Sequence, residues 1–227
     1  MTLQPGTLLS SSLVFALLAQ TAGAQTCRGR PGFTKTMVVA NAGGMRASDA
    51  RSMSAGATVG RPEGLLASVA IGYVVREASA TFSTDQTGTS LGASAAYAGT
   101  EAGGRLELCP GLGFSRIQVS GDFFGEEATL TQTSRRAGLS AGYRLPATRD
   151  VLVIPFGSAE YVWFDGSVRG DGFNLPVPED TYIPISLGLG SVWKEWIGFT
   201  LAVVIPTGLP TAHRSYVTSF SVALGGR

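Results

Sequence analysis

The feature that most constrains this chain is a series of segments, each roughly ten residues long, in which large apolar residues alternate with small ones. In 182–193 and 197–205, most alternate positions hold isoleucine, leucine, valine, phenylalanine or tryptophan, and the positions between hold mainly glycine, serine, alanine or threonine. Successive side chains of a strand point to opposite faces. The pattern therefore predicts β-strands with an apolar face toward something large and a small-residue face toward something narrow.

The scarcity of lysine constrains what surrounds the apolar face. Lys35 and Lys194 are the only lysines, whereas a soluble barrel or sandwich needs a charged outer face. Glycine, proline or polar residues interrupt every later apolar run, which leaves no candidate for a transmembrane helix. We predict an all-β fold, a closed antiparallel up-and-down transmembrane β-barrel of about ten strands, in which closure satisfies the backbone in lipid. A soluble periplasmic ligand-binding barrel is the alternative, and the few lysines argue against it.

Strands and connections can be placed along the chain. An outer-membrane barrel has short turns on the periplasmic side and long loops outside, so we place the N-terminus in the periplasm. Longer connections are expected at 43–49, 77–87, 120–128, 165–180 and 207–214. The predicted strands cover 34–41, 50–59, 64–76, 88–98, 104–119, 129–145, 151–164, 181–194, 197–206 and 215–225.

The N-terminus predicts export. Leu13–Ala19 is a short apolar core and Ala22–Ala24 is an A-x-A cleavage pattern. The core is far shorter than the roughly 20 residues of a spanning helix. We expect a signal peptide over 1–24, a periplasmic segment over 25–33 and the barrel over 34–227, as one domain, because no linker or charge run divides the mature chain.

Three short motifs add a resemblance. The opening Gln25-Thr26-Cys27, the central Leu108-Cys109-Pro110 and the closing stretch 219–227 resemble uncharacterised bacterial barrels with a matched cysteine pair. More broadly, the mature chain resembles the small outer-membrane β-barrels of the OmpA-like and OmpX-like superfamily. The resemblance implies a fold and a location, with outer-membrane lipid, lipopolysaccharide and the barrel-insertion machinery as partners. One departure is Arg227 at the C-terminus, where such barrels commonly end on an aromatic residue.

The two cysteines predict a disulfide. An exported protein meets an oxidising compartment, so we expect Cys27 to pair with Cys109, with two free thiols as the alternative. Cys109 falls on the lumen face near the periplasmic end, and the bridge would hold 28–33 at the barrel mouth. No further ligands lie at a spacing that suits a metal ion, so no metal site is expected.

A charge pair is predicted inside the barrel. If the turn 146–150 sets Leu145 opposite Val151, the same register sets Arg136 opposite Glu160. Both side chains would point into the lumen, where a charge needs a partner. Glu107, Arg144 and Arg76 are candidate neighbours. We interpret the pair as an internal strut, with a selectivity or gating element as the alternative.

Aromatic residues predict two membrane interfaces. Tyr161 and Trp163 come late in an upward strand, and Trp193 and Trp196 flank a predicted periplasmic turn. Tyrosine and tryptophan favour both interfaces of a transmembrane barrel. The alternative is that these rings fill the core of a soluble β-protein.

The sequence contains one weak candidate for a catalytic motif. His213-Arg214-Ser215 resembles the His-x-Ser of outer-membrane lipid A deacylases, but no Asp or Glu after Glu195 could orient the histidine. With a net charge of +1 and no glycine-rich phosphate loop, neither nucleic-acid binding nor a cofactor is expected. We expect a monomeric, non-enzymatic integral outer-membrane barrel with an envelope-structural or surface-interaction role and, at most, a narrow solute pathway. A lipid-modifying enzyme using His213 and Ser215 is the alternative.

Overall fold

The computed structural model describes residues 37–61, 64–78, 84–101, 104–123, 126–194, 196–207 and 214–224. The predicted signal peptide, the 25–33 segment, Cys27, His213 and Arg227 lie outside these ranges. All regular secondary structure in the described residues is strand. The strands are β1 (Met37–Arg46), β2 (Ala50–Gly60), β3 (Gly64–Arg76), β4 (Gln86–Glu101), β5 (Leu106–Phe123), β6 (Glu126–Tyr143), β7 (Leu145–Pro146), β8 (Val151–Gly170), β9 (Phe173–Trp193), β10 (Ile197–Thr207) and β11 (Ser215–Leu224).

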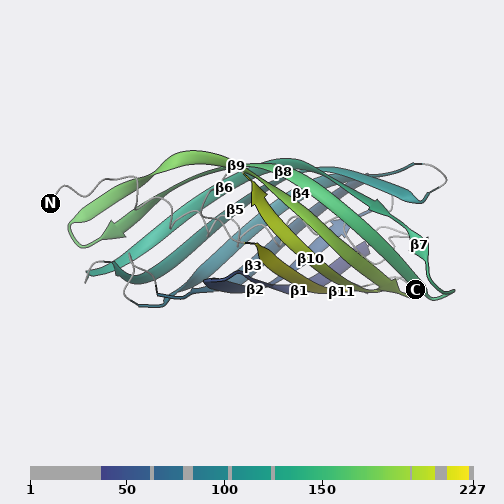
Figure 1. Cartoon of the computed structure of the whole chain (residues 1–227), viewed down its shortest axis with the longest axis horizontal. Helices are drawn as coiled ribbons and strands as arrows, with labels where there is room; N and C mark the ends of the chain where they lie inside the picture. The colour runs from purple at the N-terminus through teal and green to yellow at the C-terminus, as the bar shows by residue number, and fades with distance from the viewer. Residues whose placement is uncertain are drawn as a thin grey trace.

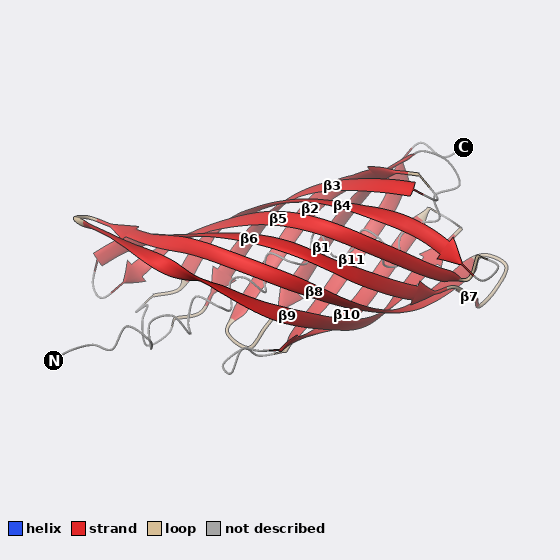
Figure 2. Ribbon diagram, turned by 90° about the horizontal axis from the view of Figure 1, so that it is seen from above, coloured by secondary structure: helices blue, strands red, loops and turns tan. Residues whose placement is uncertain are grey.

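The sheet closes into a barrel. Apart from β7, every strand pairs antiparallel with its neighbours in the sequence, β1 pairs with β11, and β6 pairs directly with β8. The short β7 pairs with β8 alone and continues the edge of β6 beyond Arg144. Figures 1 and 2 show the tilted strands running around the barrel. The predicted closed antiparallel barrel is confirmed, with ten long strands in the part of the chain that the structure describes.

The two ends of the barrel differ. The terminal end holds Met37 and Leu224. The opposite end, called the hairpin end below, is where β5 joins β6 and β8 joins β9. The expectation of long loops at 120–128 and 165–180 was wrong, because β5 and β6 are separated only by 124–125 and β8 and β9 only by 171–172. Both strand pairs continue their hydrogen bonding toward the hairpin end, where the β8–β9 hairpin projects away from β7 (Figure 1).

Outward side chains change character along the strands. On β5, Leu112 is exposed on the outer face, and Arg116, four residues further along the strand, occupies the same face. On β6, the outer face changes in the same way from Leu139 to Arg135. The change lies at a similar level of the barrel, because Leu112 pairs with Ala137, midway between these two residues. Toward the terminal end the outer wall is therefore an apolar belt. Toward the hairpin end it becomes polar.

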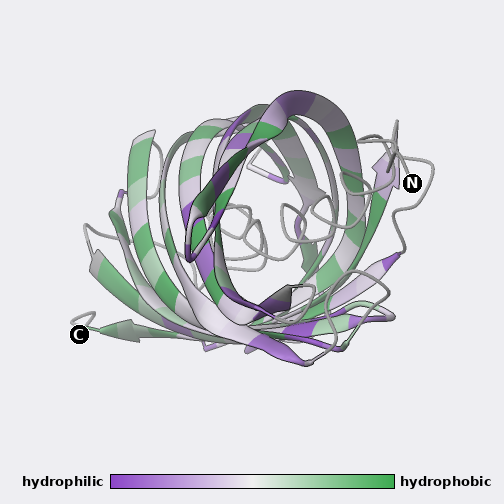
Figure 3. Ribbon diagram, turned by 90° about the vertical axis from the view of Figure 1, so that its left-hand side faces the viewer, coloured by the Kyte–Doolittle hydropathy of each residue, from purple (hydrophilic) through white to green (hydrophobic). Residues whose placement is uncertain are grey.

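Inward side chains become apolar toward the hairpin end. Beyond Ser115 on β5, the inner face carries Ile117 and Val119, which are buried, and Leu130 on β6 packs in the same cluster. Figure 3 shows the alternating apolar and polar bands around the barrel. A polar outer face over an apolar inner face is what water outside and a packed core inside require. The same period of two therefore specifies an apolar outer wall in one half and a polar outer wall in the other.

Two clusters of buried apolar side chains line the interior. A small one near the terminal end contains Cys109. The larger cluster comprises Met45, Ala50, Val74, Ile117, Val119, Ala128, Leu130, Phe156, Val162, Phe164, Val168, Val177, Tyr182, Ala202, Val204 and Val217.

Candidate functional site

A buried ion pair lies at the terminal end of the lumen. Glu107 on β5 points inward with its side chain only 2% exposed, and Arg144, directly after β6, is 30% exposed. The Arg144 guanidinium donates through both Nε and Nη2 to Glu107 Oε1, with an Nε to Oε1 distance of 2.6 Å. Both residues were predicted only as neighbours of the Arg136–Glu160 pair. Here they form the pair themselves.

The register between β6 and β8 corrects the predicted opposition of Arg136 and Glu160. Arg136 pairs with Val162 and Glu160 pairs with Gly138, because Leu145 lies opposite Val153 through β7. The turn is thus two residues wider than the sequence suggested.

Both charged side chains nevertheless lie on the inner face. Arg136, 7% exposed, occupies space above Gly113, where a Cβ would overlap its guanidinium. Glu160 lies above Gly138 in the same way, and both charges lie within electrostatic range of Tyr182. Residues offset diagonally by two are about 7–8 Å apart, within reach of long side chains. A direct Arg136–Glu160 ion pair stays a prediction.

Other polar groups cross-link the inner face. The hydroxyls of Ser115 and Ser134 are 2.6 Å apart. At the hairpin end, buried Arg76 lies 3.7 Å from Asp49, measured from Nε to Oδ2. The serine pair keeps both hydroxyls hydrogen-bonded, and the Asp49 carboxylate balances the charge of buried Arg76.

A second set of buried polar groups was not predicted from the sequence. Gln86 and Gln132 are 0% and 2% exposed, and among the described residues neither side-chain amide has a hydrogen-bond partner. Both lie at inward positions of the hairpin half, where Gln132 pairs with the apolar Ile117 and Gln86 pairs with the buried Arg76. A glutamine at an inward position among apolar ones was the available signal.

Of the two residues considered for catalysis, the structure describes Ser215. Ser215 begins β11, is fully buried on the inner face, and its Oγ has no hydrogen-bond partner in the part of the chain that the structure describes. His213 lies outside the described residues. Cys109 is buried on the inner face of β5, as predicted, and its pairing with Cys27 stays a prediction because Cys27 also lies outside them. Within the described ranges, no group of three or more His, Cys, Asp or Glu could hold a metal ion.

The four predicted interface aromatics lie on the outer wall or at its edge. Trp193 and Trp196 are exposed at the terminal end, where Lys194 Nζ lies 5.3 Å from the Trp193 ring centroid. Tyr161 and Trp163 lie on β8 beside the change from apolar to polar outer wall, with ring centroids 4.7 Å apart and planes at 71°. Their membrane contact stays a prediction.

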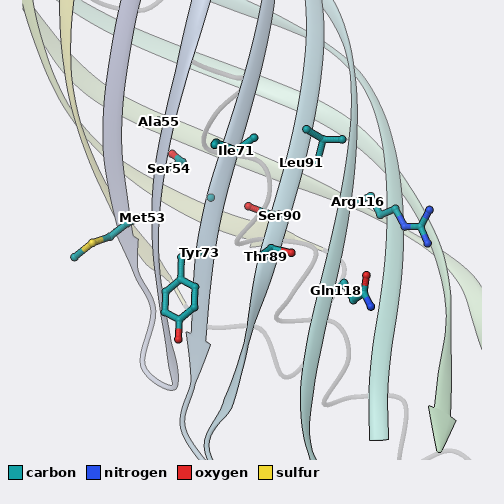
Figure 4. Close-up of a pocket in the computed structure, with 11 residues that line it drawn as sticks. Met53, Ser54, Ala55, Ile71, Tyr73, Thr89, Ser90, Leu91, Arg116 and Gln118 are labelled. Carbon is teal, nitrogen blue, oxygen red and sulfur yellow. The ribbon is translucent and has the colours of Figure 1, made fainter.

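A hollow of about 720 Å³ marks the outer wall across β2 to β5. Figure 4 shows its side chains at the level where the apolar belt gives way to polar residues. Its outward-facing lining comprises Met53, Ala55, Ile71, Tyr73, Thr89, Leu91, Arg116 and Gln118. Between them in the sequence lie the small residues Ser54, Gly72 and Ser90, which also line the hollow.

Comparison with known proteins supports the fold. The translocator domain of the autotransporter NalP from Neisseria meningitidis superposes with a TM-score of 0.51 at 10% identity, covering 97% of this chain and 98% of that chain. The chain has the fold of an outer-membrane β-barrel. The β domain of the Bordetella autotransporter BrkA gives a TM-score of 0.49 at 14% identity over 82% of this chain and 98% of that chain. LpxR from Salmonella typhimurium gives a TM-score of 0.46 at 9% identity, covering 81% of this chain and 99% of that chain.

These identities establish the fold alone. No protein-family model matches the sequence, and no curated protein matches it significantly. Among the described residues, no helix is long and apolar enough to cross a membrane.

Proposed function

We propose that this protein is a non-enzymatic integral barrel of the bacterial outer membrane, with a role in envelope structure or surface interaction. The observation that carries the proposal is the reversal of the inner and outer faces along the long strands. An apolar belt suits lipid, and the polar outer wall beyond it suits water outside the membrane. The hairpin end would then stand above the membrane as a packed, water-exposed extension that a partner could contact.

The lining of the hairpin half argues against a wide aqueous pore. Porin channels are lined by polar side chains, whereas Ile117, Leu130 and Phe164 are buried on the inner face here. Ten strands also enclose little more than the eight-stranded barrels whose interior is filled by side chains. A closed barrel is therefore favoured over a diffusion pore.

Conductance in planar bilayers tests this. The refolded protein and a Cys27→Ser/Cys109→Ser variant should both give no steady channels. Steady channels in the unmodified protein would contradict the closed barrel and establish a narrow solute pathway. Channels only in the double variant would assign gating to the segment that the predicted disulfide tethers.

The enzymatic alternative has its own test. Cells producing the protein or its His213→Ala variant should yield lipid A of identical mass composition. A lipid A species that the wild-type protein produces and that is lost with both His213→Ala and His213→Gln would contradict the non-enzymatic proposal, because neither replacement can act as a general base. The burial of Ser215 on the inner face supports our choice, because a nucleophile needs access to its substrate.

A further inference from the structure

Arg116 contrasts with three described arginines that form ion pairs. Arg76, Arg135 and Arg144 each lie within ion-pair distance of a carboxylate. Arg116 is exposed on the outer wall, and the hollow that it lines contains no Asp or Glu. A cation directed outward at the edge of an apolar belt meets the level of lipid headgroups in a membrane. The charge therefore lacks a partner within the hollow and is placed where an anionic headgroup would lie.

The sheet register arranges the hollow in two rows. Thr89 on β4 pairs with Tyr73 on β3 and with Gln118 on β5, which gives three hydrogen-bonding side chains side by side. In the adjacent row, Leu91 pairs with Ile71 on β3 and with Arg116 on β5. One row offers hydroxyl and amide groups, and the other offers apolar surface ending in a guanidinium.

This combination fits one class of ligand. A guanidinium binds a phosphate through parallel N–H···O bonds, and neighbouring hydroxyl and amide donors complete such a site. Ile71 and Leu91 supply the surface that an acyl chain covers. Because the hairpin end faces outward in the proposed function, the lipid at this level belongs to the outer leaflet.

We propose that the hollow binds lipid A of lipopolysaccharide, with a lipid A phosphate held by Arg116 and Gln118 and an acyl chain lying along Leu91 and Ile71. The proposal rests on the proposed outer-membrane orientation. Arg51, outward on β2 two residues from Met53 of the hollow, adds positive charge on the opposite side. Electrostatic attraction to the phosphate is thus supplied from both flanks of the site.

Native mass spectrometry of the refolded full-length barrel in detergent tests the site, with diphosphoryl lipid A as the probe. Arg116→Gln should weaken binding about tenfold, the loss expected for one charge-assisted contact. Arg135→Gln is the matched control, because Arg135 is also outward, on the next strand, but lies 3.8 Å from Asp165. It should bind lipid A like the unmodified protein. Leu91→Asn should weaken binding without changing the charge.

Each other outcome overturns the proposal. Equal losses for Arg116→Gln and Arg135→Gln would show diffuse attraction to any outward cation. Unchanged binding for Arg116→Gln would remove the site. Equal binding of dephosphorylated lipid A would exclude phosphate recognition, and equal Arg116-dependent binding of phosphatidylglycerol would exclude lipid A as the specific occupant. Heat-dependent gel mobility confirms that each variant folds, and the conductance result is independent of all these outcomes, so failure of this site is distinguishable from failure of the proposed function.

Discussion

The ion pair between Glu107 and Arg144 predicts that replacing one partner lowers the free energy of unfolding more than replacing the other. Removing either one leaves the other without its bond, but the two residues differ in access to water. Glu107 is 2% exposed, whereas Arg144 is 30% exposed and can turn toward solvent. An unpaired charge costs most where it stays buried.

We therefore expect unequal costs. Breaking a fully buried pair costs about 3–5 kcal/mol, so Arg144→Gln, which strands the buried carboxylate, should lower the free energy of unfolding by about 3 kcal/mol. Glu107→Gln leaves a neutral amide that can still accept a hydrogen bond from an arginine with access to water. That change should cost about 1 kcal/mol.

Urea unfolding of the refolded barrel in lipid vesicles, followed by tryptophan fluorescence, measures both costs. The double variant Glu107→Gln/Arg144→Gln should lose less unfolding free energy than the two single variants lose together, because the second change no longer breaks an intact pair. A Glu107→Gln variant that loses as much stability as Arg144→Gln, or more, would refute the reasoning from burial.

Three further predictions concern other parts of the barrel. Leu112→Arg, on the apolar belt, should cost about 2–4 kcal/mol of unfolding free energy in vesicles, whereas Gln118→Arg on the same face should cost about 1 kcal/mol or less; equal costs would contradict the belt boundary. Ile117→Ala removes a buried side chain from the large cluster and should lower the unfolding free energy by about 2–5 kcal/mol in the same assay. No loss of stability would show that the hairpin half is not packed. Peptide mass mapping without reduction should find Cys27 linked to Cys109, and recovery of both as alkylated monomers would disprove the bridge.

Period-two alternation was sufficient to predict the strands and the closure, because it depends only on side chains pointing alternately to two faces. The register between β6 and β8 was not predictable at the same level. Arg136 was set opposite Glu160 by assuming a tight turn after Leu145, and the pairing of Leu145 with Val153 moved it by two residues. Turn geometry fixes register, and the sequence of this turn allows more than one width.

The hairpin half was misread for a different physical reason. Acidic and glycine residues near Asp165 and Gly166 suggested a loop, yet they continue the β8 strand through an irregular pairing between Phe164 and Gly166. A strand in water has a polar outer face, so its outward positions resemble loop residues. The hollow at Arg116 was also beyond sequence analysis, because its rows join residues of three strands whose alignment depends on two separate registers.

The position of the membrane boundary is tested most directly by cysteine labelling in intact cells. Thr131→Cys and Leu139→Cys place single new thiols at outward positions of β6 on either side of Arg135, and the unmodified protein gives the background. With a membrane-impermeant maleimide, we predict labelling of Thr131→Cys and none of Leu139→Cys, which lipid covers. Labelling of both, or of Leu139→Cys alone, would contradict an apolar belt in lipid and a hairpin end exposed at the cell surface.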